Sequence, residues 1–103
     1  MLTGASSISQ SGMSAAVQRL DAAASNTANR STPDYQRARV EQTESANGGV
    51  QARTVRTEDR NDTEQAAVQD VIESRVAERD FQANAAAFRA RNDAVGSLFS
   101  EKA

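Results

Sequence analysis

The sequence contains no cysteine, no histidine and no tryptophan, and its only lysine is Lys102. These absences exclude disulfides, thiolate metal sites, cysteine nucleophiles and histidine general bases, and they leave no internal lysine for a Schiff base. Acidic pairs such as Glu58-Asp59 fall in a polar stretch where solvated charge is expected. Asn47-Gly48-Gly49 lacks the following helix and lysine of a phosphate-binding loop. The sequence therefore predicts a protein that is not an enzyme, with no cofactor, no metal and no small-molecule substrate.

Long apolar runs are also missing. No stretch reaches the 18 apolar residues that a membrane-spanning helix needs, so no direct membrane span is expected. The 12 basic residues are interleaved with 14 acidic ones, which leaves no basic stripe to bind nucleic acid. Residues 1–30 lack the basic start and apolar core of a Sec signal, so export would have to use another route.

The material for a hydrophobic core is scarce. Hydrophobic residues make up 38% of the chain, many of them alanine, with three phenylalanines and one tyrosine. Burial of so little apolar surface stabilises a fold weakly against the loss of backbone entropy. We therefore expect a monomer that is marginal or partly unfolded and gains stability from neighbours. All basic residues except Lys102 are arginine, which suits bidentate pairing with carboxylates at interfaces; genomic base composition explains that usage equally well.

The first zone, residues 1–34, is predicted to form a helix and a turn. From Ser7 to Asn29 the apolar residues recur in steps of three and four, which places Met13, Val17 and Leu20 on one helical face. Residues before Ser7 are expected to be flexible in the free chain. Pro33, within a run of turn-forming residues, ends the zone.

The second zone, residues 35–62, is predicted to hold a short polar β-hairpin and a charged linker. Two β-permissive runs, 39–44 and 50–57, flank Asn47-Gly48, a dipeptide typical of hairpin turns. An isolated two-stranded hairpin is marginal in water, so it should pack on a helix or on a neighbouring subunit.

The third zone, residues 63–103, is predicted to be one long helix from an N-cap at Thr63 to about Ser100. Some 35 residues at 1.5 Å each span about 50 Å, which implies an elongated molecule. Its apolar residues form two stripes. The first comprises Val68, Ile72, Val76, Ala83, Ala87, Ala90 and Ala94; the second comprises Phe81, Ala85, Phe88, Val95 and Phe99, and Leu98 lies between them.

The two stripes together are wider than the seam of a two-stranded coiled coil. The first helix of the same chain can cover one, and the other then needs a further partner. The alternative is a small three-element bundle that covers both internally. The predicted fold class is mainly α, with elongated N- and C-terminal helices pairing as a coiled-coil-like hairpin around a short β-hairpin, in one structural domain.

Two segments of the chain carry motifs of a known protein family. Ser11-Gly12-Met13-Ser14-Ala15, followed by Ser25-Asn26-Thr27-Ala28-Asn29 and Thr32-Pro33-Asp34-Tyr35, is similar to the N-terminal signature of the flagellar rod and hook proteins. Residues 75–84, Arg-Val-Ala-Glu-Arg-Asp-Phe-Gln-Ala-Asn, resemble the C-terminal signature. Asp34 stands where the family has glycine, but aspartate tolerates positive φ better than most residues. Thr27 stands where the family prefers a larger apolar residue.

The resemblance implies a short, proximal-rod-like structural subunit of the flagellar basal body. Such subunits polymerise through their terminal helices into a tubular axial structure and are exported unfolded by the flagellar type III apparatus, without a Sec signal. The expected partners are further copies, other rod and hook subunits and the export apparatus, and the expected location is the periplasmic rod. The alternative is a soluble adaptor or export-regulating protein that binds flagellar partners through a rod-like helix hairpin.

Fifteen residues are predicted to form the interface. They are Met13, Val17, Leu20, Asn26, Asn29, Pro33, Tyr35, Ile72, Val76, Phe81, Asn84, Phe88, Val95, Leu98 and Phe99. Some have a simpler explanation: Asn26 and Asn29 can merely terminate the helix, and the phenylalanines can fill an internal core. Asn84 can set the register of a helix seam or simply face solvent.

Overall fold

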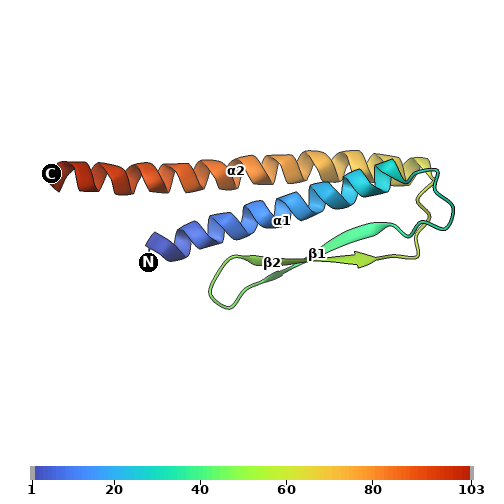
Figure 1. The fold of residues 1–103 in the computed structure, drawn as a ribbon, viewed down its shortest axis with the longest axis horizontal. Coiled ribbons are helices and arrows are strands. Elements are labelled where there is room, and N and C mark those ends of the chain that lie inside the picture. The colour runs from blue at the N-terminus through green and yellow to red at the C-terminus, as the bar shows by residue number, and fades with distance from the viewer. Residues whose placement is uncertain (1, 103) are drawn as a thin grey trace.

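The computed structural model describes the backbone of residues 2–102 and the side chains of residues 6–100. Helix α1 (Leu2–Ala28) is followed by strands β1 (Ala38–Glu44) and β2 (Val50–Arg56) and by helix α2 (Glu64–Lys102). The helices run antiparallel, and the molecule measures 62 × 24 × 16 Å (Figure 1). The elongated, mainly α architecture with one β-hairpin is confirmed. The coiled-coil character of the helix pair stays a prediction.

The ends of the elements follow local chemistry. Helix α1 begins at Leu2, so residues 2–6, which we expected to be flexible, are helical, and Met1 lies outside the described residues. At the turn, Asp34 adopts a φ of 60°, the conformation that glycine would favour. The hydroxyl of Thr63 accepts a hydrogen bond from the Ala66 amide at 3.0 Å, which confirms the predicted N-cap of α2.

The β-hairpin is antiparallel, with Ala38 opposite Arg56 and Glu44 opposite Val50. Its loop spans residues 45–49, and both Gly48 (φ 86°) and Gly49 (φ 83°) occupy the left-handed region that side chains disfavour. Close packing adds a second constraint, because a Cβ added to Gly49 would lie 2.6 Å from the Ser11 Oγ. The loop thus depends on glycine for both its conformation and its contact with α1.

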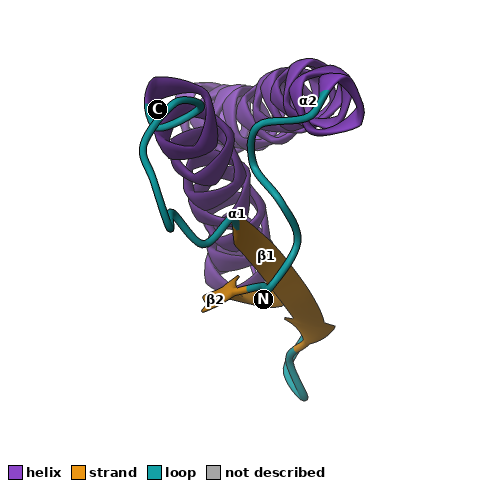
Figure 2. Cartoon of the chain, turned by 90° about the vertical axis from the view of Figure 1, so that its right-hand side faces the viewer, coloured by secondary structure: helices purple, strands orange, loops and turns teal. Residues whose placement is uncertain are grey.

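Helix α1 is the central layer of the fold. It packs against α2 on one side and against both strands on the other, while the strands make no close approach to α2 (Figure 2). The residues that it buries are small: Ala15, Ala16, Ala22 and Ala23. A core of alanines lets the elements approach closely but removes little apolar surface from water.

From Ala66 to Asn84, the residues of α2 that face inward are small or polar. Ala66, Asp70 and Ala77 are buried, and Glu73, Asp80 and Asn84 are half-buried. These positions alternate in steps of three and four, so they form one stripe along the helix. Between Ala66 and Asn84 the seam with α1 therefore lacks the large apolar residues that usually fill such contacts, while Phe88 and Val95 are half-buried further along α2.

Neither predicted apolar stripe is fully covered within the chain. All seven residues of the first stripe are exposed, and so are Phe81 and Phe99 of the second, while Ala85, Phe88 and Val95 are half-buried against α1. The three-element bundle that would bury both stripes is therefore wrong. On α1, the predicted apolar face is not fully covered either, because Val17 is exposed and Met13 and Leu20 are only half-buried.

Gly12 marks a close approach between the two helices, and this predicts opposite effects for two glycine substitutions. A Cβ added at Gly12 would lie 2.5–2.6 Å from side-chain atoms of Asn84, whereas one added at Gly96 would meet nothing within 4 Å. Gly12→Ala should lower the free energy of unfolding by about 1 kcal/mol, because displacing Asn84 outweighs the gain in helix propensity. Gly96→Ala should raise it by about 0.5–1 kcal/mol. Urea unfolding followed by circular dichroism measures both, and an equal stabilisation by the two substitutions would contradict the close approach.

Candidate functional site: a buried polar cluster and exposed apolar faces

The carboxylate of Asp70 joins four segments of the chain. It lies on the inward face of α2 and is 3% exposed. Arg37, just before β1, donates from Nη2 to Oδ1 at 2.7 Å and from Nη1 to Oδ2 at 3.1 Å. Arg30, after the end of α1, donates from Nη2 to Oδ2 at 2.6 Å. Two guanidinium groups thus neutralise one buried carboxylate, a pairing that a carboxylate needs when it leaves water.

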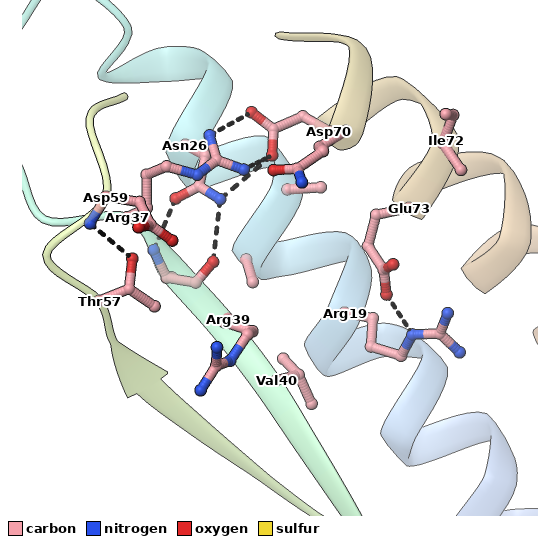
Figure 3. Close-up of a pocket in the computed structure, with 14 residues that line it drawn as sticks. Arg19, Asn26, Arg37, Arg39, Val40, Thr57, Asp59, Asp70, Ile72 and Glu73 are labelled. Carbon is pink, nitrogen blue, oxygen red and sulfur yellow. Dashed lines mark hydrogen bonds and ion pairs between the residues drawn. The ribbon is translucent and has the colours of Figure 1, made fainter. Parts of the chain in front are cut away.

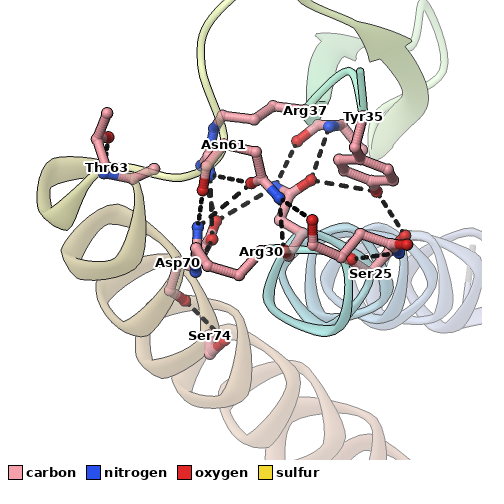
Figure 4. A network of polar contacts seen from close by, with 12 residues as sticks. Ser25, Arg30, Tyr35, Arg37, Asn61, Thr63, Asp70 and Ser74 are labelled. Atoms are coloured by element: carbon pink, nitrogen blue, oxygen red, sulfur yellow. Dashed lines mark hydrogen bonds and ion pairs between the residues drawn. The ribbon is translucent and has the colours of Figure 1, made fainter. Parts of the chain in front are cut away.

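Two asparagines complete this polar cluster (Figure 4). The Asn61 amide donates to the backbone carbonyls of Asn26 and Asn29, both at 2.9 Å, and its Oδ1 accepts from Arg37 at 2.9 Å. The linker before α2 is thereby fastened to the free carbonyl end of α1, where helices leave acceptors unpaired.

Asn26 connects α1 to the hairpin. Its Oδ1 accepts from the Ala38 amide at 2.8 Å and its Nδ2 donates to the Ala38 carbonyl at 2.9 Å. The side chain thus pairs with β1 as a neighbouring strand would, and Nδ2 also reaches Asp70 Oδ1 at 3.2 Å. With 2% of its surface exposed, Asn26 is used inside the chain and is not available to a neighbouring subunit.

Tyr35 anchors the turn to the outside of this cluster. Its hydroxyl lies 2.6 Å from the Ser25 Oγ, and Arg56 donates to the same hydroxyl at 3.2 Å. The Arg56 guanidinium also stands 5.5 Å from the ring centroid, within the range of a cation–π contact. The Tyr35 hydroxyl thus links α1, the turn and β2.

A second polar crosslink lies further along the helix seam. Arg19 of α1 binds Glu73 and donates to Asp80 Oδ2 at 2.7 Å. The hydrogen bonds that Arg19 donates to Glu73 and Asp80 together outweigh the effect of burial and raise the pKa of Arg19. Arg19 therefore holds two turns of α2 against α1 as a permanent cation.

A groove of about 470 Å³ opens between α2 and β1 (Figure 3). Ala22 and Ala23 of α1 line it, together with Val40 of β1 and Ile72 of α2. The Asp70 cluster lies at one end of the view and the Arg19–Glu73 pair at the other. Its polar groups are largely committed to one another, so the groove offers no set of groups arranged for acid–base or nucleophilic chemistry. Among the described residues, no acidic group is placed to hold a metal ion.

The predicted interface residues fall into three classes. Val17, Pro33, Ile72, Val76, Phe81, Leu98 and Phe99 are exposed; Met13, Leu20, Asn29, Tyr35, Asn84, Phe88 and Val95 are half-buried; Asn26 is buried. The structure brings Asn26, Asn29 and Tyr35 together around the turn. Leu98 (57% exposed) and Phe99 (72% exposed) instead lie near the far end of α2, so the fifteen residues do not form one continuous surface.

Sequence reasoning missed Arg30, Arg37, Asn61 and Asp70 as a group. One signal was available in the pattern of α2. Thr63, Asp70, Ala77 and Asn84 are seven residues apart and all small or polar, so an inward seam of that kind could have been inferred. The arginines could not have been assigned to Asp70, because the partner of a surface-type residue depends on tertiary packing.

Comparison with known protein families gives a match in the segment that forms most of α1 and the turn. A family model described as flagella basal body rod protein matches residues 7–36, which include Asn26, Arg30 and Tyr35. Over this segment the chain is similar to the flagellar basal body rod protein family. The rod family is a structural one, so the match indicates a flagellar rod-related, structural role at the basal body.

The family model does not match the rest of the chain, residues 37–103. The match to the rod family ends before β1, so the resemblance of residues 75–84 to the C-terminal signature stays a prediction. No curated protein matches the chain. Neither helix of the described chain is both long and apolar enough to cross a membrane.

The Asp70 cluster predicts a large loss of stability on removal of one charge. Asp70→Asn leaves the buried Arg37 and the half-buried Arg30 without their carboxylate, so the free energy of unfolding should fall by about 3 kcal/mol. Asp21→Asn makes the same chemical change at an exposed position of α1 and should alter it by less than about 0.5 kcal/mol. Urea unfolding at pH 7 measures the free energy of unfolding of both variants. Similar small effects in both variants would show that the cluster does not hold the fold together.

The same carboxylate predicts a pH dependence. Burial opposes ionisation of Asp70, but the hydrogen bonds from Arg37, Arg30 and Asn26 outweigh it, so its pKa lies below the ordinary value of 3.8. A carboxyl group with a lowered pKa stabilises the fold above its unfolded-state pKa and loses that contribution as it becomes protonated. The melting temperature of the native chain should therefore fall as the pH drops below about 4. In Asp70→Asn the fall should be shallower, and parallel curves for the two proteins would refute the assignment.

Proposed function

We propose that the chain is a structural subunit of the flagellar rod that polymerises through its terminal helices into a tubular axial structure. Its place is the periplasmic part of the basal body, and it is exported by the flagellar type III apparatus without a Sec signal. Its partners are further copies and other rod and hook subunits. The observation that carries this proposal is the family match over α1 and the turn, on a chain whose other helix leaves most of its large apolar residues exposed.

The exposed residues support assembly. Val68, Val71 and Ile72 are 56–57% exposed, and Phe99 is 72% exposed. Large apolar side chains at regular positions along a helix cost free energy in water unless a partner covers them. Single exposed residues are ordinary on protein surfaces, but here they extend along nearly the whole of α2.

The polar cluster supports a precise geometry for the subunit. The Asp70 cluster fixes how α1, the turn, β1 and α2 meet, while the alanine seam supplies little apolar burial. A subunit of this kind presents its outer faces in one defined arrangement, which a regular polymer requires. The weak core fits a chain that unfolds readily for export and is stabilised by its neighbours afterwards.

A second candidate is a soluble adaptor or export-regulating protein that uses the helix hairpin to bind flagellar partners. The specific observation in its favour is that the polar cluster is complete within one chain, because all bonding groups around Asp70 come from the same molecule. Such a chain can fold alone, whereas a subunit that folds only on polymerisation would leave these groups to its neighbours.

An assembly experiment separates these two functions. A tagged native chain should co-purify with isolated basal bodies, and Phe81→Ser with Phe99→Ser should reduce its amount there by roughly tenfold, because exposed aromatics dominate interface energies. Gln82→Ser, at an exposed polar position of the same helix, is the matched control and should leave the amount unchanged. Mass spectrometry of basal bodies and swimming assays measure the result. If the native chain is missing from basal bodies and runs in a soluble complex of fixed size, the adaptor function replaces the rod function.

A further inference from the structure

The outward face of α2 carries one continuous stripe with its own periodicity. Its nine positions follow steps of four, four and three throughout: Val68, Ile72, Val76, Arg79, Ala83, Ala87, Ala90, Ala94 and Leu98. All nine are exposed. This eleven-residue repeat, about 3.67 residues per turn, stays nearly parallel to the axis of a straight helix. The stripe from residue 68 to residue 98 is therefore an almost straight apolar line about 45 Å long.

Side-chain size is distributed unevenly along this outward stripe. The large residues Val68, Ile72, Val76 and Arg79 come first, and the alanines at 83, 87, 90 and 94 follow. A second copy laid antiparallel, with Ala83 opposite Ala83, places Ile72 against Ala94 and Val76 against Ala90. Large residues then face alanines over the central part of the stripe, as close packing requires, and Val68 faces Leu98 at each end. A parallel copy in register would place large residues against large ones and leave gaps between alanines.

Charge favours the same arrangement. Arg75 and Asp93 lie 18 residues, or five helical turns, apart, so they occupy one line beside the outward stripe. Both are exposed, and no ion pair among the described residues includes either of them. In the antiparallel pair, Arg75 of each copy lies within two residues, about 3 Å along the axis, of Asp93 in the other. Arg79 would face Ala87, whereas a parallel pair in register would place Arg79 against itself.

We propose that two copies of this chain form an antiparallel dimer through the outward stripe of α2, with the two-fold axis at Ala83. A face about 45 Å long and one helix wide buries roughly 500 Å² per copy, below the standard of about 800 Å². The dimer is therefore weak and depends on concentration. A two-fold contact is closed, so a dimer cannot add a third copy through the same face. The dimer goes beyond the proposed rod function: it is a soluble form that hides the outward stripe.

The absence of cysteine allows a direct test with single introduced cysteines. Across the two-fold axis, helices 8–10 Å apart bring the two Cα atoms of residue 83 to about 4–5 Å, within disulfide range. Ala83→Cys in the full chain should form a covalent dimer under mild oxidation. Ala90→Cys is the matched control, because its two copies would lie about 21 Å apart along the axis. Circular dichroism checks that both variants keep the native helix content.

Three outcomes decide the proposal. Crosslinking of Ala83→Cys alone supports it. Equal crosslinking of both variants indicates a parallel or random contact, and failure of both together with a monomer at millimolar concentration removes the dimer; either overturns it. Neither result bears on the rod function, which is judged by the presence of the chain in basal bodies.

Sedimentation equilibrium of charge variants gives an independent check. Arg75→Asp or Asp93→Arg alone places like charges together at two symmetric positions and should weaken dimerisation about tenfold. The double variant restores opposite charges and should return close to the native dissociation constant. A double variant as weak as the single ones would overturn the proposed register.

Discussion

The fold depends on one carboxylate that two arginines neutralise in a buried position. Asp70 is the point at which the end of α1, the segment before β1 and the inward face of α2 meet, through Arg30 and Arg37. A buried ion pair contributes less net stability than apolar groups of equal volume, but it fixes direction, because each oxygen accepts from defined donors. In a chain whose core is mostly alanine, this directional bonding decides how the elements are joined.

This constraint explains why the two faces of α2 differ in composition. The inward seam carries alanine, aspartate, glutamate and asparagine, which allow close approach and polar crosslinks to α1. Val68, Ile72, Val76 and Leu98 stand on the opposite side of α2, where they are exposed. In an ordinary globular helix the apolar face points inward. The reversal fits a molecule whose internal contacts set geometry and whose external contacts supply hydrophobic burial.

Much of the architecture could be predicted from local signals, because those signals act over short distances. Pro33 ends a helix, Thr63 begins one, and Asn47-Gly48-Gly49 marks the loop of a hairpin; the structure has all three features at these places. The faces of the helices could not be assigned in the same way. Counting apolar residues suggests that Met13, Val17 and Leu20 form the seam, yet the chain packs through alanines and charged groups on a neighbouring face. The hydrophobic pattern predicts which residues are stabilised by burial. It does not predict whether the same chain or a neighbouring molecule buries them.

The family match and the polar cluster involve overlapping sets of residues. The matched segment, residues 7–36, supplies Asn26 and Arg30, but their partners Asn61 and Asp70 lie beyond it. The N-terminal helix and turn of the rod family are thus completed here by a long second helix after only a short hairpin. The two helices hold 27 and 39 of the 103 residues, so helix faces are the main surfaces that the chain can offer to neighbours. The uncovered side of α2 extends furthest among them, because its exposed apolar residues run from Val68 to Leu98.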